Sequence, residues 1–271
     1  MTRRDAPVAV VCALEDELAH LRDALGAGRE EWRDGRLYRH GALAGLPLVL
    51  VRCGIGMLGA AAATEALIIH QRPAAVLNYG CTGAHRADLL PGDLVLGARV
   101  VAYDSVRVAP DGREAYHPMY YLRAGRQERS AYLPADPALL AAARRAAAAL
   151  EGRHEPWPPA SGWPAAVPHR APRLCVGVVA SADRFNRSQE RIRAIAGLHE
   201  SLCEDMEAAA IALTCASHDV PFLTIKDISN NELLRTTDAA YFDGETAAQL
   251  GRRAAALTLA TLRAWAVERG A

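Results

Sequence analysis

The sequence lacks the short motifs that identify several common enzyme classes. It has no G-x-G-x-x-G dinucleotide fingerprint, no Walker phosphate loop, no G-x-S-x-G nucleophile elbow and no H-E-x-x-H zinc motif. Its six cysteines form no C-x-x-C pair and no Cys/His ligand spacing, which argues against a zinc site and a disulfide framework. We therefore expect no metal and no cofactor. The scattered cysteines fit a reduced, cytoplasmic compartment best.

An excess of one charge and a long apolar run are absent as well. The chain carries 31 basic and 31 acidic side chains, and its only lysine is Lys226. A general binder of nucleic acids or membrane surfaces would show a basic excess, so we expect neither kind of partner. The first apolar run, at residues 6–14, breaks at Glu15 and is too short to span a membrane. No signal peptide is apparent.

The order of apolar segments predicts an α/β fold. With 271 residues, about half of them apolar, the chain suits one large domain or two small ones. Strands that are apolar on both faces alternate with helical stretches, which indicates a largely parallel sheet covered on both sides. The predicted strands are 6–14, 46–56, 73–84, 174–181 and 220–229, with one or two more in 92–104. The predicted helices are 15–25, 58–70, 134–152, 188–197, 203–218 and 246–268.

One segment interrupts this alternation. Residues 154–172, HEPWPPASGWPAAVPHRAP, contain too much proline for regular structure. An interdomain linker is possible, but a helix before it and a strand after it favour a surface insertion at about 153–172. We therefore predict a single domain over 1–271. Trp157 and Trp163 of the insertion could cover a pocket or pack locally.

The ends of the predicted strands carry the residues that chemistry would need. In open α/β sheets, ligands bind beyond the carboxyl ends of the strands. These ends are polar or glycine-rich here, and glycine lets the backbone approach a ligand closely. They comprise residues 15–17, 54–56, 80–83, 181–185 and 227–231.

Six of these segments together carry a family resemblance. ALEDEL, CGIGMLGAAAAT, NYGCTGAHRADLLPGDLVLG, SADRFNRS, EDMEAAAIA and IKDISN follow one another along the chain. From residue 7 to about 265 the sequence resembles the nucleoside phosphorylase/nucleosidase superfamily, and is most similar to its methylthioadenosine/S-adenosylhomocysteine nucleosidases. The resemblance implies a three-layer αβα sandwich around a central mixed, largely parallel sheet. It also implies a homo-oligomer, with a dimer favoured.

The resemblance assigns two carboxylates to the reaction. Glu207 matches the glutamate that accepts hydrogen bonds from the ribose 2′- and 3′-hydroxyls, a task that suits a carboxylate. Its negative charge would also stabilise an oxocarbenium-like transition state. Glu17 matches the carboxylate that polarises the attacking water. The plainer alternative for both is a carboxylate in a first helical turn, favoured by the helix dipole.

The resemblance also implies the contacts to the nucleoside. Phe185 would stack on the purine and Met206 would pack under the ribose, although either side chain could simply belong to the core. The remaining predicted substrate contacts are Ile55, Cys81, Thr82 and Gly83, from the glycine-rich segments that face the sugar and the base.

Hydrolysis and phosphorolysis differ in what they require around the nucleophile. The phosphorylases of the superfamily surround phosphate with arginines, and Asn78 stands where one of these would be. The acidic residues 15–17 would repel phosphate. Arg52 and Arg86 lie nearby in the sequence and keep phosphorolysis open as the alternative.

The main departure from the nucleosidases is Asn230. The adenine-specific enzymes end the corresponding strand in I-S-D, and that aspartate protonates the purine; asparagine cannot deliver a proton, although it can donate an N–H. The substrate is then a 6-oxopurine nucleoside, or a 5′-modified adenosine whose base is activated by Asp227 or another group. A catalytically silent nucleoside-binding protein is the third possibility. We predict a purine nucleosidase with Glu17, Asn230 and Asp227 as its catalytic candidates.

Overall fold

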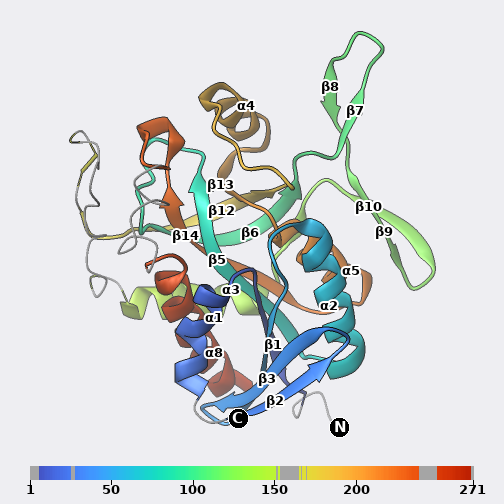
Figure 1. Cartoon of the computed structure of the whole chain (residues 1–271), viewed down its shortest axis with the longest axis vertical. Coiled ribbons are helices and arrows are strands. Elements are labelled where there is room, and N and C mark those ends of the chain that lie inside the picture. Colours follow the sequence, from blue (N-terminus) through green and yellow to red (C-terminus); the bar gives the residue numbers. More distant parts are fainter. Residues whose placement is uncertain are drawn as a thin grey trace.

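A computed structural model describes residues 6–25, 28–150, 152, 165, 167–168, 170–237 and 249–269. These residues form a ten-stranded mixed sheet with helices on both faces (Figure 1). The predicted three-layer αβα architecture is therefore confirmed. Trp157 and Trp163 lie outside the described residues, as does most of the proline-rich segment.

The strands of the main sheet and the helices alternate along much of the chain. The strands are β1 (Val8–Cys12), β2 (Arg29–Arg33), β3 (Arg36–Leu43), β4 (Leu46–Arg52), β5 (Ala75–Ala84), β6 (Leu94–Ala102), β11 (Leu133–Pro134), β12 (Leu174–Ser181), β13 (Ser201–Asp205) and β14 (Phe222–Asn230). The helices are α1 (Glu15–Arg22), α2 (Met57–Gln71), α3 (Pro137–Leu150), α4 (Gln189–His199), α5 (Ala208–Ser217) and α8 (Arg252–Arg269).

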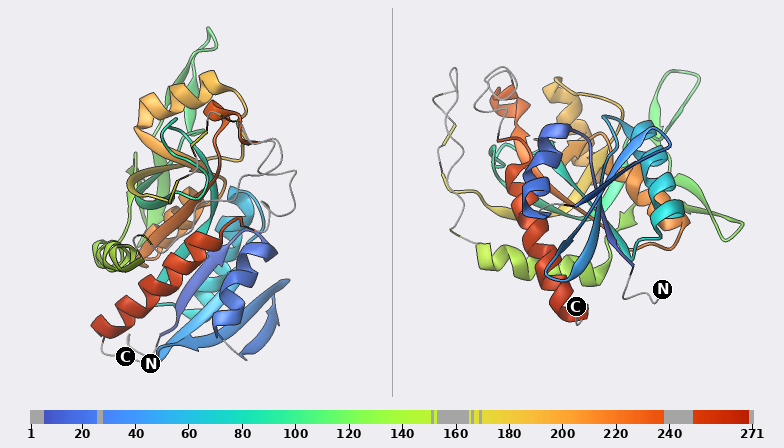
Figure 2. Two further views of the ribbon diagram at one scale, coloured as in Figure 1. Left: turned by 90° about the vertical axis from the view of Figure 1, so that its left-hand side faces the viewer. Right: turned by 60° about the horizontal axis from the view of Figure 1, so that its bottom comes forward.

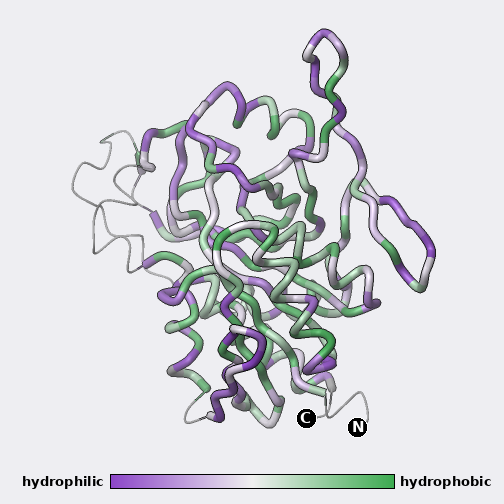
Figure 3. The backbone as a smooth tube through the Cα atoms, turned by 45° about the vertical axis from the view of Figure 1, so that its right-hand side comes forward, coloured by the Kyte–Doolittle hydropathy of each residue, from purple (hydrophilic) through white to green (hydrophobic). Residues whose placement is uncertain are grey.

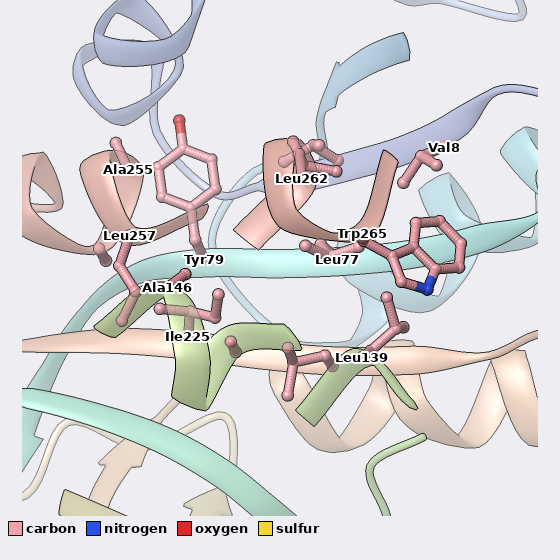
Figure 4. Close-up of a cluster of buried hydrophobic side chains, with 14 of the residues drawn as sticks. Val8, Leu77, Tyr79, Leu139, Ala146, Ile225, Ala255, Leu257, Leu262 and Trp265 are labelled. Atoms are coloured by element: carbon pink, nitrogen blue, oxygen red, sulfur yellow. The ribbon is translucent and has the colours of Figure 1, made fainter. Parts of the chain in front are cut away.

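The period of two along each strand divides the core between the two faces of the sheet. In β1, Val8 and Val10 pack on the side of α1, α3 and α8, whereas Ala9 and Val11 pack on the side of α2 and α5. Figures 1 and 2 show α8 and α2 on opposite sides of the central strands. Figure 4 shows part of the core on the side of α1, α3 and α8, where Trp265 of α8 lies beside Leu77 of β5.

Five strands of the sheet close into a ring. β5 pairs with β14, β14 with β6, β6 with β12, β12 with β13, and β13 again with β5. β1 pairs with β5 and β4 in parallel and extends the sheet away from this ring. Because β1, β5 and β14 all run in the same direction, their carboxyl ends meet at one end of the sheet.

The structure corrects one predicted helix and adds elements that the sequence pattern did not predict. The helix expected over 203–218 is wrong at its start, because Ser201–Asp205 form β13 and α5 begins only at Ala208. β13 takes this form because it is held between β12 and β5. The hairpin β2–β3 was not predicted, nor were the hairpins β7 (Val106–Val108)–β8 (Glu114–Tyr116) and β9 (Met119–Arg123)–β10 (Arg126–Ser130).

The two small hairpins, β7–β8 and β9–β10, project from the body of the molecule, and Figure 3 shows more hydrophilic residues on them than on the central strands.

Among the described residues, no helix combines the length and apolar character needed to cross a membrane. Helix α3, predicted over 134–152, begins at Pro137, because Asp136 is its N-cap: Asp136 Oδ1 accepts hydrogen bonds from the N–H groups of Ala138 and Leu139 at 3.0 Å.

Candidate active site

A cavity opens at the end of the sheet where β1, β5, β13 and β14 finish. It brings together nine of the ten site residues predicted from the sequence, all except Asp227. These nine are Glu17, Ile55, Cys81, Thr82, Gly83, Phe185, Met206, Glu207 and Asn230. The other residues that line it are Ala13, Leu14, Tyr79, Arg184, Asn186, Glu204, Asp205 and Lys226. The cavity therefore has an apolar wall and several charged groups, as expected of a site for a small polar ligand.

Glu17 lies in the first turn of α1 with its carboxylate turned inward and 2% of the residue exposed. Oε2 accepts hydrogen bonds from the N–H groups of Ala13 and Leu14, at 3.2 and 3.1 Å. Oε1 accepts a hydrogen bond from the N–H of Cys81 at 2.9 Å. Gly80 permits this approach, because a Cβ at residue 80 would lie only 2.5 Å from Glu17 Oε1. Three backbone donors thus fix one carboxylate at the cavity wall.

Glu207 stands at the N-cap position of α5 and is also buried. Its Oε1 accepts a hydrogen bond from the N–H of Gly56 at 2.8 Å, and no described residue donates to its Oε2. Burial and the neighbouring Asp205 carboxylate raise the pKa of Glu207 to about 7, against the opposing effects of Lys226 and the Gly56 N–H. Glu207 can therefore change its charge near neutral pH.

Lys226 is the buried cation of this site. Its Nζ lies 2.7 Å from Asp205 Oδ2, and both side chains are almost completely buried. Burial by itself would lower the pKa of Lys226, but Asp205 and Glu207 outweigh this effect and the net shift is upward. Lys226 therefore stays charged and partly balances the carboxylates around it.

Asp205 has a second, structural task. Its Oδ1 accepts a hydrogen bond from Ser181 Oγ at 2.5 Å, and its Oδ2 accepts one from the N–H of Ala208 at 3.0 Å. The carboxylate thus satisfies a free N–H in the first turn of α5 and ties β12, β13 and β14 together at the cavity.

Asn230 ends β14 with 5% of the residue exposed. Its Oδ1 accepts a hydrogen bond from Ser229 Oγ at 2.7 Å, and its Nδ2 donates one to Thr237 Oγ1 at 3.1 Å. The second N–H of this amide remains available to a ligand. Asn230 can therefore donate to a base, as the sequence suggested, from a fixed orientation.

Asp227 lies on the opposite side of β14 and does not line the cavity. Its Oδ1 accepts a hydrogen bond from the N–H of Gly251, and its Oδ2 accepts from the N–H groups of Arg253 and Ala254, at 3.0–3.3 Å. Burial raises the pKa of Asp227 to about 7. The strand alternation that brings Lys226 to the cavity thus turns Asp227 to the start of α8, where it caps the helix.

Some of the cavity residues that were not predicted do stand out in the sequence. Lys226 is the only lysine and interrupts a core strand, and Glu204 and Asp205 belong to the acidic segment before α5. The contact between Asp205 and Lys226 could not be predicted, because residues 203–205 were assigned to a helix rather than to a strand. Arg184 and Asn186 flank Phe185 but carried no signal of their own.

The arginines and the asparagine considered for phosphorolysis lie elsewhere. Arg52 lies 3.6 Å from Glu15, Arg86 is bound bidentately by Asp88, and neither lines the cavity. Asn78 is buried, where its Nδ2 donates to the carbonyl of Val11 and its Oδ1 accepts from Thr224 Oγ1. Arg184 is the only arginine among the described residues that line the cavity.

Known proteins resemble this chain over most of its length. A family model described as the Phosphorylase superfamily matches residues 7–263. The 5′-methylthioadenosine/S-adenosylhomocysteine nucleosidase of Geobacillus kaustophilus is 33% identical over 223 residues, which cover 82% of this chain and 83% of that protein. The nucleosidase of the same name from Bacillus thuringiensis is 30% identical over 224 residues, covering 82% of this chain and 85% of that protein.

Solved structures of nucleosidases with the same name also resemble this chain. The 5′-methylthioadenosine/S-adenosylhomocysteine nucleosidase of S. pneumoniae, bound to a transition-state inhibitor, matches with a TM-score of 0.75 and 27% identity. The corresponding enzyme of Neisseria meningitidis, in complex with methylthio-immucillin-A, matches with a TM-score of 0.75 and 28% identity. Both alignments cover 95% of this chain and 99% of the other.

Proposed function

The chain belongs to the phosphorylase superfamily, and we propose that it is an enzyme that hydrolyses the N-glycosidic bond of purine nucleosides. The observation that carries this proposal is the pairing of two buried carboxylates, Glu17 and Glu207, in one cavity. One carboxylate can activate water and the other can hold the sugar. A carboxylate that activates water is also what inverting glycoside hydrolysis uses.

Glu207 would hold the ribose. The Gly56 N–H occupies Oε1, so Oε2 can accept hydrogen bonds from the vicinal 2′- and 3′-hydroxyls. As the glycosidic bond lengthens, positive charge grows on the sugar, and an ionised Glu207 stabilises it. Met206 and Ile55 supply apolar contacts to the nucleoside, and Phe185 supplies a ring on which the base stacks.

Glu17 would act on the attacking water. Its three backbone donors leave a lone pair on Oε1, because Oε1 accepts only the Cys81 N–H. A water molecule bound there can give its proton to Glu17 as its oxygen forms the bond to the sugar. Cys81, Thr82 and Gly83 form the wall of the cavity between this position and Asn230.

Water is favoured over phosphate by the charges in the cavity. Glu17, Asp205 and Glu207 line it, and the buried Lys226 of its wall is already paired with Asp205. A doubly charged phosphate would be repelled, whereas the growing positive charge of the sugar would be stabilised. Phosphorolysis remains the second candidate, with Arg184 as the available phosphate contact.

An assay of nucleoside cleavage tests this proposal. Adenosine, 5′-methylthioadenosine and inosine are incubated with the enzyme, with and without phosphate, and free base and sugar products are measured. We expect base and free ribose in the absence of phosphate. Ribose 1-phosphate that forms only when phosphate is present would instead establish phosphorolysis. Saturable nucleoside binding without any turnover would establish a binding protein.

We also propose that the protein is a cytoplasmic homo-oligomer, with a dimer favoured. All six cysteines are free thiols, which suits a reducing compartment. Helix α2 exposes Leu58 and Ile69 (83% and 55%), and β9 exposes Leu122 (64%), so apolar side chains are available for contact with a second copy. Light scattering after gel filtration would measure the mass; a monomer at micromolar concentration would contradict the proposal.

A further inference from the structure

The proposed reaction lacks a proton donor for the departing base. A purine leaves more readily when a ring nitrogen takes up a proton, and loss of such help typically costs about 10²–10⁴ in rate. Asn230 can donate a hydrogen bond but has no proton to transfer. Asp227 is directed away from the cavity to the start of α8. Another acid is therefore needed beside Asn230.

Glu204 lies on the other side of the same gap in the cavity wall. In the sheet, Gly83 of β5 is the register partner of both Glu204 in β13 and Asn230 in β14. A Cβ at Gly83 would lie 3.8 Å from Glu204 Cγ and 3.7 Å from both heavy atoms of the Asn230 amide. The two side chains therefore flank the space that the missing side chain of Gly83 leaves open, and all three residues line the cavity.

Three polar side chains surround the carboxyl group of Glu204. Asn186 Nδ2 donates a hydrogen bond to Oε2 at 2.6 Å, and the buried His85 places its Nε2 3.3 Å from the same oxygen. Burial raises the pKa of Tyr103, and a hydrogen bond from its hydroxyl to Glu204 adds to this effect. Because Glu204 lines the cavity, a ligand can still reach its carboxyl group.

His85 requires a proton between itself and Glu204. Its Nδ1 lies 2.7 Å from Ser201 Oγ, and its Nε2 has no hydrogen bond of good geometry to any described residue. If Nδ1 accepts from Ser201, then Nε2 carries a hydrogen that points at the carboxyl group. If Nδ1 donates to Ser201, then Nε2 is a bare acceptor that needs a hydrogen from Glu204. Only the second arrangement leaves Glu204 protonated, and a protonated carboxyl group at the cavity wall can act as an acid.

We propose that Glu204 is the general acid that protonates the leaving purine, with His85 and Asn186 as positioning residues. This inference rests on the proposed nucleosidase function. The proton of the Glu204 carboxyl group passes to a ring nitrogen of the base as the bond to the sugar breaks and its electron pair goes to the base. Water forms the new bond to the sugar and gives its proton to Glu17. The resulting Glu204 carboxylate accepts hydrogen bonds from Asn186 and Tyr103, and it regains a proton from solvent after the products leave.

Two leaving groups test this role. Purine nucleosides need a proton to leave, whereas 4-nitrophenyl β-D-ribofuranoside releases a weakly basic phenolate that does not. We expect Glu204→Gln to lower kcat for the purine nucleoside by about 10²–10⁴ and to lower cleavage of the phenyl riboside far less. His85→Gln should lower only purine cleavage, and by a smaller factor. Glu207→Gln should slow both substrates, because it acts on the sugar.

A matched control and a rescue complete the experiment. Glu200→Gln changes an exposed glutamate just before β13 and should affect neither substrate. Glu204→Gln combined with Asn230→Asp should regain purine cleavage, because the aspartic acid supplies a proton at the same gap. Regained cleavage would also show that a chain carrying Glu204→Gln can fold, and circular dichroism checks the fold of the single variant.

The outcomes separate this inference from the proposed function. Equal loss on both substrates, or no loss on either, in Glu204→Gln would overturn the role of Glu204 while leaving a nucleosidase. A wild-type protein that cleaves neither substrate would overturn the proposed function itself, and the inference with it.

Discussion

Replacing Glu207 with glutamine tests the centre of the proposed site. Glutamine keeps an oxygen that can accept the Gly56 N–H, so the start of α5 should remain in place. The change removes the negative charge and one pair of acceptor positions from the group that would hold the ribose. A charged acceptor strengthens a hydrogen bond by about 1–2 kcal/mol over a neutral one, so two hydroxyls lose roughly 30- to 1000-fold in kcat/KM.

The same variant should change the pH dependence of activity. Since burial and Asp205 raise the pKa of Glu207 to about 7, the wild-type carboxyl group ionises only as the pH rises through neutrality. Its kcat/KM should therefore rise with pH up to about 7, at up to tenfold per pH unit. Glu207→Gln should lack this rising limb, because its amide does not ionise.

The contribution of Glu207 to the free energy of unfolding should fall as the pH rises, whereas its contribution to activity should rise. The pKa of Glu207 rises from 4.5 to about 7 on folding, so the carboxyl group favours the native state below pH 4.5 and loses this contribution between pH 4.5 and 7. At about 1.4 kcal/mol per pH unit, the loss reaches at most about 3 kcal/mol. Glu207→Gln escapes this loss, so above pH 7 it should be more stable than the wild type.

Steady-state kinetics from pH 5 to 9 and urea unfolding at pH 4.5, 6 and 8 measure both effects, with Glu200→Gln as the control. A pH–rate profile that keeps its rising limb in Glu207→Gln would refute the assignment of that limb to Glu207. A difference in unfolding free energy that does not vary with pH would refute the raised pKa.

Three further variants examine the surroundings of the site. Gly80→Ala places a Cβ 2.5 Å from Glu17 Oε1, so it should displace the carboxylate and lower kcat in the same assay with little change in secondary structure by circular dichroism; unchanged kcat would contradict the role of Glu17. Phe185→Ala should raise KM about 5- to 150-fold, because stacking on a base is worth about 1–3 kcal/mol, and an unchanged KM would exclude stacking. Asp227→Ala removes the cap of α8, so thermal unfolding should show a loss of about 1–2 kcal/mol, or roughly 2–8 °C, with KM unaltered. A large rise in KM in that last variant would place Asp227 in the reaction after all.

Much of the fold could be predicted because its signals are local. The strands β1, β4 and β12 are largely apolar runs, β5 and β14 begin with apolar residues, and Asp136 and Pro137 mark the start of α3. The hairpins β2–β3 and β9–β10 were missed, since β2 and β10 are polar and largely exposed and so show no apolar alternation. β13 was missed because its form depends on two neighbouring strands rather than on its own sequence.

Nine of the ten predicted site residues line one cavity for a related reason. The motifs that carry them follow the ends of neighbouring strands, and the carboxyl ends of parallel strands meet at one edge of a sheet. Their composition and order along the chain were therefore enough to place them together. Their roles in the reaction remain predictions that the proposed variants test.

Tertiary structure alone decided which polar groups face the cavity and with which partners. The strand IKDISN contains both Asp227 and Asn230, but only packing against α8 shows that the aspartate is a helix cap. The contact of Glu204 in β13 with His85, which directly follows β5, joins residues that are 119 positions apart, and it arises from sheet register across Gly83. The sequence by itself determined the chemistry that is available. Because side-chain direction and cross-strand contacts depend on the pairing of distant segments, only the folded chain determined which of those groups can act together.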